Sequence, residues 1–280
     1  MRHCPSKAMC LAIVLAMTGA TAAFSQDAPG TSVRVNGAGI SSDQVQLWAR
    51  SFMDSNAGTR VMVTGSSAGK GFESLLERNA DIAIASRVIS SEEEKKAQTM
   101  GMQLQECLVG YSGIAVITSP KNTVSDLSMS QLKKVFSGEY TNWNQVGGPD
   151  SPIRCLARRV PESGATDFFQ EKVLDKQPYG SNTAILESWS SIIKVCSGAT
   201  DLPVGLAPVI QALAAHQSIK VIGLKQDEHS PGVKPSEDTL RDKSYPIILA
   251  FKFYWDQKTQ SSQAKQFVEY CVRQGLSSQK

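Results

Sequence analysis

The sequence has few of the residues from which metal sites and hydrolytic sites are built. It contains three histidines and six cysteines in 280 residues, and no two cysteines have the CxxC or CxxxC spacing of a zinc site. His216 and His229 lie in its second half, and a histidine without a paired nucleophile and carboxylate rarely acts as a catalytic base. The sequence therefore predicts no metal ligand, no catalytic residue and no cofactor.

Beyond the first residues of the chain, no segment is both long and uncharged enough to span a bilayer. Residues 1–25 carry positive charge at Arg2 and Lys7, continue with an apolar run shorter than the ~20 residues of a transmembrane helix, and end in small residues. This pattern is typical of a secretory signal peptide. We expect cleavage near residues 22–25 and a soluble protein that is exported to the periplasm.

An excess of charge of one sign is missing as well. The whole chain has a formal charge of +3 at pH 7, and removal of residues 1–25 leaves 27 basic against 26 acidic residues. Such a balance gives no support to binding of nucleic acid or of an anionic membrane surface. The roughly 255 residues that remain suffice for two modest lobes, each with its own core.

Four cysteines remain after the expected cleavage: Cys107, Cys155, Cys196 and Cys271. An even number in an exported chain is typical of disulfide-bonded proteins. We predict a bond between Cys155 and Cys196, which fall in the same expected lobe, and consider a second between Cys107 and Cys271. Two buried free thiols are the alternative for the second pair.

Short β-branched runs alternate with helical patterns along most of the chain. Strands are expected at residues 32–39, 59–65, 80–86, 111–119, 151–159, 202–208, 218–224 and 245–255. Helical patterns lie between most of these runs, and one more closes the chain at residues 261–275. Such alternation is typical of an α/β fold with a mostly parallel sheet.

Glycine and hydroxyl residues gather at three expected strand-to-helix junctions. These are NGAGISS at 36–42, TGSSAGKG at 64–71 and RRVPESGAT at 158–166. The free N–H groups and the positive dipole end of a helix N-terminus bind anions, and serine hydroxyls add donors. One such junction alone is commonly a capped glycine turn. Three in one chain, the third beside two arginines, indicate an oxyanion site.

The second junction differs from a nucleotide-binding loop. That loop has four residues between its two glycines and a serine or threonine after its lysine. Here three residues separate Gly65 from Gly69, and Gly71 follows Lys70. Nucleotide hydrolysis is therefore not expected.

These motifs, in this order, resemble the phosphate-binding, periplasmic solute-binding proteins of ABC importers. The matching segments are NGAGIS, GSSAGKGFESLLERNADIAIAS, LKKVFSGEYTNWNQVGGPDSPI, R-x-x-x-SGAT and VGLAPV. The resemblance implies a two-lobed α/β protein of the type II periplasmic binding protein kind. It would have mixed sheets, helices on both faces and a ligand cleft between the lobes. The implied lobes are residues 26–117 with 208–280, and residues 118–207.

The resemblance also implies anion-binding residues. The matching positions are Ser41, Ser66, Arg159, Ser163 and Gly164. Ser41 belongs to the first anion loop, Ser66 to the second and the others to the third, where Arg159 would neutralise the anion through charge-assisted hydrogen bonds. Its neighbour Arg158 is expected to face outward or to support Arg159.

Two positions depart from the family's pattern. Arg87 occupies the place of an aspartate that accepts a hydrogen bond from the proton on phosphate, and an arginine has no acceptor. If Arg87 points into the cleft, the site would favour a larger or more negative anion or discriminate less; if it points outward, it would clamp the lobes or meet a partner. Glu162 or another carboxylate is a third possibility. Ala165 stands where the family has a threonine, and Thr166 would compensate.

The expected function is that of an exported binding protein, not an enzyme. It would capture inorganic phosphate or a related tetrahedral oxyanion between its lobes and deliver it to an ABC permease in the membrane. We expect a monomer that does not bind nucleic acid. The alternative is an oxyanion sensor or adaptor of the same fold that signals to a membrane partner.

Overall fold

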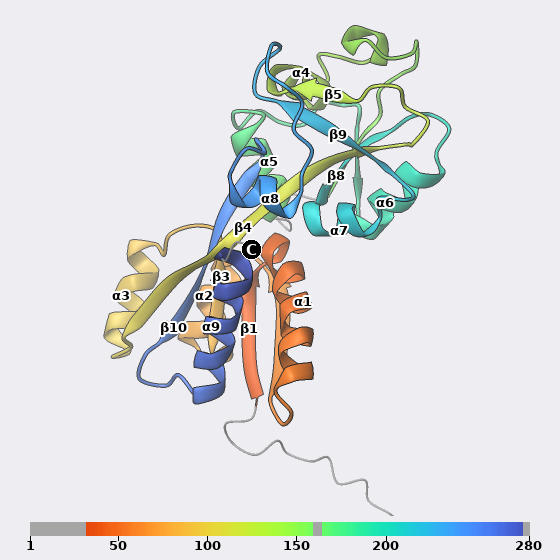
Figure 1. The fold of residues 1–280 in the computed structure, drawn as a ribbon. Coiled ribbons are helices and arrows are strands. Elements are labelled where there is room, and N and C mark those ends of the chain that lie inside the picture. The colour runs from red at the N-terminus through yellow and green to blue at the C-terminus, as the bar shows by residue number, and fades with distance from the viewer. Residues whose placement is uncertain (1–31, 159–163, 277–280) are drawn as a thin grey trace, which may run out of the picture.

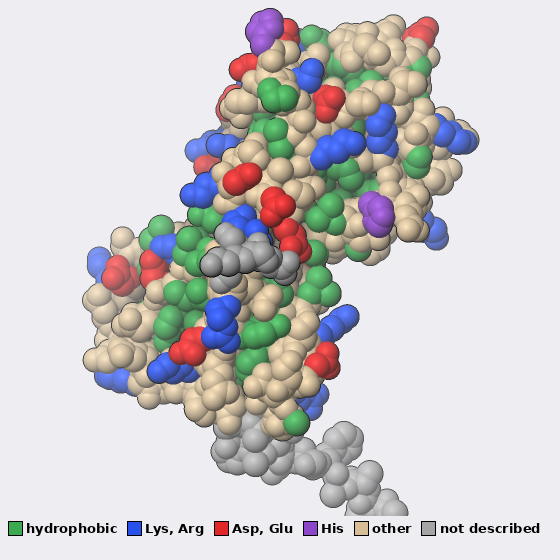
Figure 2. Space-filling model, viewed as in Figure 1, with side chains coloured by type: hydrophobic (Ala, Val, Ile, Leu, Met, Phe, Trp, Pro, Cys, Tyr) green, Lys and Arg blue, Asp and Glu red, His purple; other side chains and the backbone are tan. Residues whose placement is uncertain are grey.

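Two lobes with a narrow waist between them make up the molecule (Figure 1), and the space-filling view shows the same two lobes (Figure 2). This computed structural model describes residues 32–158 and 164–276. The predicted signal peptide, residues 1–25, lies outside the described residues, as do Arg159, Glu162 and Ser163. Within the described ranges, no helix combines the length and the apolar character that a membrane crossing requires.

The first lobe is built on a five-stranded mixed sheet with the strand order β2-β1-β3-β10-β4. The strands are β1 (Ser32–Ala38), β2 (Arg60–Ser66), β3 (Ile82–Ala85), β4 (Leu104–Thr118) and β10 (Ile248–Asp256). β1 is parallel to β2 and β3, whereas β10 is antiparallel to both of its neighbours, β3 and β4. The parallel strands bring the carboxyl ends of β1 and β2 to the same edge of the sheet, where both glycine-rich junctions begin.

Helices cover both faces of this sheet. α1 (Gly39–Ser55) and α9 (Ser262–Leu276) share one hydrophobic cluster with it, and α2 (Ala68–Leu76) and α3 (Ser91–Thr99) share another. The central strand β3 supplies both clusters, because its side chains alternate between the two faces. Ile82 and Ile84 join the first cluster, whereas Ala83 and Ala85 join the second. The fully apolar sequence IAIA is thus explained by burial on both sides.

The second lobe contains the remaining strands and helices (Figure 1). Its main sheet has the order β4-β8-β6-β7, and β9 pairs with both β4 and β5. The strands are β5 (Asp126–Ser128), β6 (Cys155–Arg158), β7 (Thr183–Leu186), β8 (Val204–Pro208) and β9 (Lys220–Lys225). The helices are α4 (Met129–Phe136), the 3-10 helix η1 (Trp143–Val146), α5 (Gly164–Lys172), α6 (Trp189–Gly198), α7 (Val209–Ala214) and α8 (Glu237–Arg241).

The long strand β4 belongs to both lobes. Its residues 104–113 pair with β10 in the first sheet, and its residues 114–118 pair with β8 in the second. One continuous strand therefore carries the chain through the waist (Figure 1). The two-lobed α/β architecture with mixed sheets and helices on both faces, expected from the sequence, is confirmed.

The boundaries of the two lobes stay a prediction. The sequence led us to assign residues 208–280 to the first lobe, but β9 pairs with β4 and β5, and Ala212 of α7 and Ile222 of β9 lie in the hydrophobic cluster that holds β6 and β8. Leu240 of α8 lies in the same cluster. We therefore propose that residues 209–241 belong to the second lobe.

The four described cysteines are free thiols, so the structure does not contain the disulfide bonds that the sequence led us to expect. Cys155 Sγ lies 3.5 Å from the carbonyl oxygen of Val135, and Cys196 Sγ lies 3.8 Å from that of Ile117. Burial raises the pKa of both thiols to about 12, which disfavours the thiolate that disulfide exchange requires. Both side chains act as small core residues of the second lobe.

Alkylation of the denatured, unreduced protein that lacks residues 1–25 tests this assignment. We expect mass spectrometry to show four alkyl groups per chain, because every thiol is free. A reducing agent should leave the melting temperature unchanged. Uptake of two groups or none, restored to four by reduction, would contradict the free-thiol assignment.

Candidate anion-binding site

A cavity of about 300 Å³ lies where the two lobes meet, and both lobes contribute to its walls. The first lobe supplies the start of α1 and the end of β2. The second supplies the end of β6 and the first residues of α5 and α6. The lining residues are Gly39, Ile40, Ser42, Asp43, Gln46, Gly65, Ser66, Arg158, Ala165 and Trp189. Polar groups from several separate segments therefore converge on one space.

The N-terminus of α1 faces this cavity without a side-chain cap. Gly39 and Ile40, the first two helical residues, line the cavity, and Ala38 at the N-cap position makes no side-chain hydrogen bond to the helix. The first four N–H groups of a helix have no partner within it, and the aligned peptide dipoles add about half a positive charge at that end. A 17-residue helix with this end open is suited to hold an anion.

The end of β2 brings a serine hydroxyl to the same wall. A Cβ on Gly65 would lie 2.5 Å from Ser42 Oγ, so a glycine lets α1 approach the strand closely at this point. Ser66 Oγ donates to Asn36 Oδ1 at 2.7 Å, and Asn36 Nδ2 in turn donates to Ser74 Oγ at 2.7 Å. A hydroxyl has one proton, so Ser66 donates to an anion only after its O–H turns away from Asn36.

The second lobe supplies a positive charge through Arg158. This residue ends β6, and its guanidinium lies 5.1 Å from the centre of the Trp189 ring. The sequence led us to expect Arg158 to face outward or to support Arg159, but the structure places it in the cavity wall. A cation–π contact holds the guanidinium beside the cavity while leaving its N–H groups available.

A carboxylate lies in the same cavity. Asp43 of α1 lines it and accepts a hydrogen bond from Gln211 Nε2 of α7, with 2.6 Å between nitrogen and Oδ2. Burial raises the pKa of this carboxyl, while the hydrogen bond from Gln211 and the charge of Arg158 oppose the rise. Asp43 and Arg158 are the charged groups among the described residues of the wall.

Some of the anion-binding residues that the family resemblance implied line the cavity, and others do not. Ser66 lines the cavity, and so does Ala165, which follows Gly164 at the start of α5. Ser41 is fully buried beneath it, where Ser112 Oγ donates to its hydroxyl at 3.2 Å, and the next residue, Ser42, reaches the cavity instead. Thr166 is also fully buried. Arg159 and Ser163 lie outside the described residues.

Arg87 lines a neighbouring cavity of about 270 Å³ rather than the one that holds Ser66. Its guanidinium forms two hydrogen bonds with Glu93, of 2.8 and 2.7 Å, and lies 5.0 Å from the centre of the Phe72 ring. Glu93 also accepts from the backbone of Ser90 in the capping box of α3. These contacts hold Arg87 against its own lobe. Asp167 and Glu171 of α5 form the opposite wall of that cavity.

Three wall residues were not expected from the sequence: Asp43, Gln46 and Trp189. Asp43 and Gln46 follow the NGAGISS junction on α1, so their closeness to a glycine-rich junction was the available signal. Trp189 carried no such signal, because its place depends on how α6 packs beside β6.

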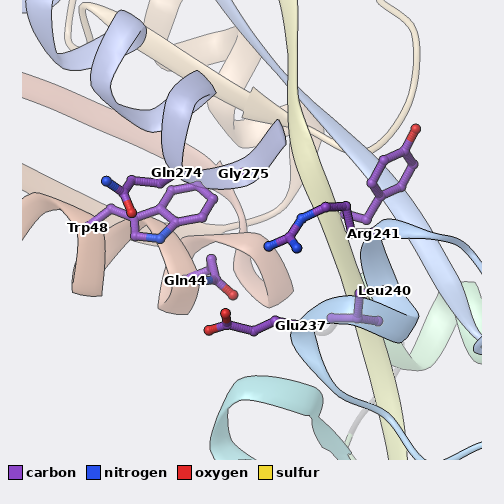
Figure 3. Close-up of a pocket in the computed structure, with 8 residues that line it drawn as sticks. Gln44, Trp48, Glu237, Leu240, Arg241, Gln274 and Gly275 are labelled. Carbon is purple, nitrogen blue, oxygen red and sulfur yellow. The ribbon is translucent and has the colours of Figure 1, made fainter. Parts of the chain in front are cut away.

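A smaller cavity lies on the other side of α1 (Figure 3). It measures about 90 Å³ and lies between α1, α8, α9 and β4. Its one arginine, Arg241, is paired with Asp238 at 3.2 Å, and its wall includes the carboxylate of Glu237. The smaller volume and this pairing make it a poorer anion site.

The segment Gly65 to Gly69 has the Gly-x-Ser-x-Gly spacing of a nucleophilic elbow and lies between β2 and α2. Its central Ser67 has unstrained extended backbone angles and caps α2 by accepting from Lys70 N. The described histidines, His216 and His229, are both exposed and line neither cavity between the lobes. No group of three potential metal ligands occurs among the residues described. Within the part of the chain that the structure describes, the cavity walls offer donors for binding and show no activated nucleophile.

Two lobes with a polar cavity between them define the fold of a ligand-binding protein. The chain belongs to the family described as the PBP superfamily domain, whose model matches residues 22–274. Among curated relatives, the phosphate-binding protein PstS of Staphylococcus aureus (strain USA300) is 26% identical over 218 residues. That match covers 76% of this chain but 63% of the relative, so this chain spans less than two thirds of the relative's length.

Solved structures of similar shape support the same fold. A putative phosphate ABC transporter substrate-binding protein from Clostridium perfringens, solved with bound phosphate, has a TM-score of 0.68 at 24% identity, covering 85% of this chain and 92% of that one. An ABC-type phosphate transport receptor from Vibrio cholerae has a TM-score of 0.63 at 22% identity, covering 85% and 93%. At these identities the structures show the fold, and the ligand has to be argued from the cavity.

The pairing of Arg87 with Glu93 predicts a pH-dependent contribution to stability. The arginine holds the pKa of Glu93 at about 2, below its ordinary 4.5. A depressed carboxyl pKa stabilises the folded state above pH 4.5, and this contribution is lost as the pH falls through about 2. Glu93→Gln should therefore lower the free energy of unfolding by ~0.5–1 kcal/mol at pH 7, a small effect because the pair is partly open to solvent.

Urea denaturation at pH 7, and at the lowest pH where the native state persists, measures this difference. Glu94→Gln is the matched control, since Glu94 is also in the first turn of α3 but is exposed. Equal losses for the two variants, or a loss that does not shrink in acid, would show that the ion pair contributes nothing.

Proposed function

We propose that the protein binds phosphate or a related tetrahedral oxyanion between its lobes, without catalysing a reaction. The observation that carries this proposal is the convergence on one cavity of the open N-terminus of α1, Ser66 and Arg158. Each supplies N–H or O–H donors that an oxyanion needs to replace its water shell. The names of the relatives from Staphylococcus aureus, Clostridium perfringens and Vibrio cholerae support phosphate as the first ligand to test.

The same relatives support a place for the protein outside the cytoplasm. The signal-peptide pattern of residues 1–25 is consistent with export to the periplasm. There the protein would act as a monomer that closes on its ligand by bending at the waist and then docks on an ABC permease. The continuity of β4 through the waist supports such bending, because few connections have to change when the lobes approach.

Titration calorimetry with anion-stripped protein tests the binding function. We expect phosphate to bind with a stoichiometry of one per chain, because one cavity joins the donors of both lobes. Small-angle scattering should show a smaller radius of gyration with phosphate than without it. Absence of binding to phosphate, arsenate and sulfate by protein shown to be folded would refute the proposal.

The role of Arg158 gives a sharper test of the location. Arg158→Met keeps an unbranched apolar stem but removes the guanidinium, and we expect a loss of ~2 kcal/mol or more in phosphate binding, since a desolvated anion loses a charged partner. Arg154→Met is the control: Arg154 also lies in the second lobe, but it pairs with Asp201 and does not line the cavity. Comparable losses in the two variants would place the anion elsewhere.

A further inference from the structure

The cavity needs a hydrogen-bond acceptor if it is to recognise a protonated anion. Hydrogen phosphate carries a P–O–H group, whereas sulfate at the same pH carries none. An acceptor beside the bound anion therefore distinguishes the two, since it gains a hydrogen bond from phosphate and meets only negative oxygen atoms of sulfate. Arg87, at the position of the family's aspartate, has no acceptor and is engaged by Glu93.

Asp43 is placed to fill this need. It lines the same cavity as Ser66 and Arg158, whereas Glu171 and Asp167 line the neighbouring one. Among the described residues, one side chain donates a hydrogen bond to the Asp43 carboxylate: Gln211 donates from Nε2 to Oδ2. A carboxylate has about four acceptor positions, so this contact leaves Oδ1 able to accept from a ligand. Gln211 belongs to α7 and holds the carboxylate of Asp43 through this contact.

We propose that Asp43 determines the specificity of this site by accepting a hydrogen bond from the P–O–H group of phosphate and by repelling sulfate. This inference rests on the proposed function of the same cavity. The acceptor would then lie on α1, forty-four positions before Arg87. Arg87 is the residue at the aspartate position of the family's pattern.

Asp43 supplies the negative charge among the described residues of the cavity wall, so its protonation state decides whether the wall repels sulfate. Arg158 of β6 is positively charged, and Gln211 of α7 is uncharged. The other wall side chains from β2, α5 and α6 are those of Ser66, Ala165 and Trp189.

Burial raises the pKa of Asp43. In acid the carboxyl becomes protonated and turns from acceptor to donor, which removes its repulsion of sulfate. Sulfate should therefore bind more tightly as the pH falls through the pKa of Asp43.

Competition between phosphate and sulfate, measured by calorimetry at neutral pH, tests the assignment with Asp43→Asn. We expect the wild-type protein to prefer phosphate by ~100-fold or more, because a site built around a ligand hydroxyl strongly rejects an analogue without it. The amide of the variant donates to sulfate, so its preference should fall at least ~10-fold. Asp54→Asn, with the same change at an exposed position of the same helix, should keep the wild-type ratio.

The pH dependence of sulfate binding provides a second readout that does not depend on how well the variant folds. Sulfate keeps its charge from neutral to mildly acidic pH, so tighter sulfate binding by the wild-type protein in acid would report protonation of Asp43. In folded Asp43→Asn, sulfate affinity should vary less with pH. Tighter binding in acid to the wild type alone supports the assignment.

The outcomes separate this inference from the proposed function. Absence of binding to every oxyanion would refute the function itself. Phosphate binding with an unchanged phosphate-to-sulfate ratio in Asp43→Asn would leave the function standing and overturn the role of Asp43. Equal or preferential binding of sulfate by the wild-type protein at neutral pH, or a sulfate affinity that does not rise in acid, would overturn it as well.

Discussion

The two lobes are held together by the backbone hydrogen bonds of one shared strand, β4. This strand is hydrogen-bonded to β10 in the first lobe and to β8 in the second, so it belongs to both sheets. This linkage sets the carboxyl ends of β1 and β2 opposite the end of β6. The cavity results from that opposition, because neither lobe alone has both the open helix N-terminus and the arginine.

The charges of the cavity follow from its two walls. The first lobe contributes the partial positive charge of α1 together with the carboxylate of Asp43, and the second contributes Arg158. Full positive charge therefore comes from one lobe, while the acceptor comes from the other. A ligand that carries both negative oxygen atoms and a proton can satisfy both walls at once, which gives closure of the lobes an energetic reason. Arg87 stands apart, since Glu93 already neutralises it.

The sequence predicted the fold well, because alternation of buried runs and helical patterns reports local burial, as in the IAIA strand. It also marked the junctions that line the cavity. The resemblance named Ser41, whereas Ser42 is the residue that lines the cavity. Neighbouring helical residues differ by about 100° in direction, and packing against Ser112 buries Ser41. The number of cysteines could not reveal that Cys155 and Cys196 each face a backbone carbonyl, because pairing depends on three-dimensional placement.

We propose that a tetrahedral oxyanion binds between the lobes, at the N-terminus of α1. Diffraction from crystals grown with arsenate, collected at the arsenic absorption edge, locates the anion by its anomalous signal, independently of any assumption about its ligands. We expect one peak per chain within hydrogen-bonding distance of Ser66, Arg158 and the first N–H groups of α1. A peak in another cavity, or none in crystals of a protein that binds arsenate in solution, would contradict it.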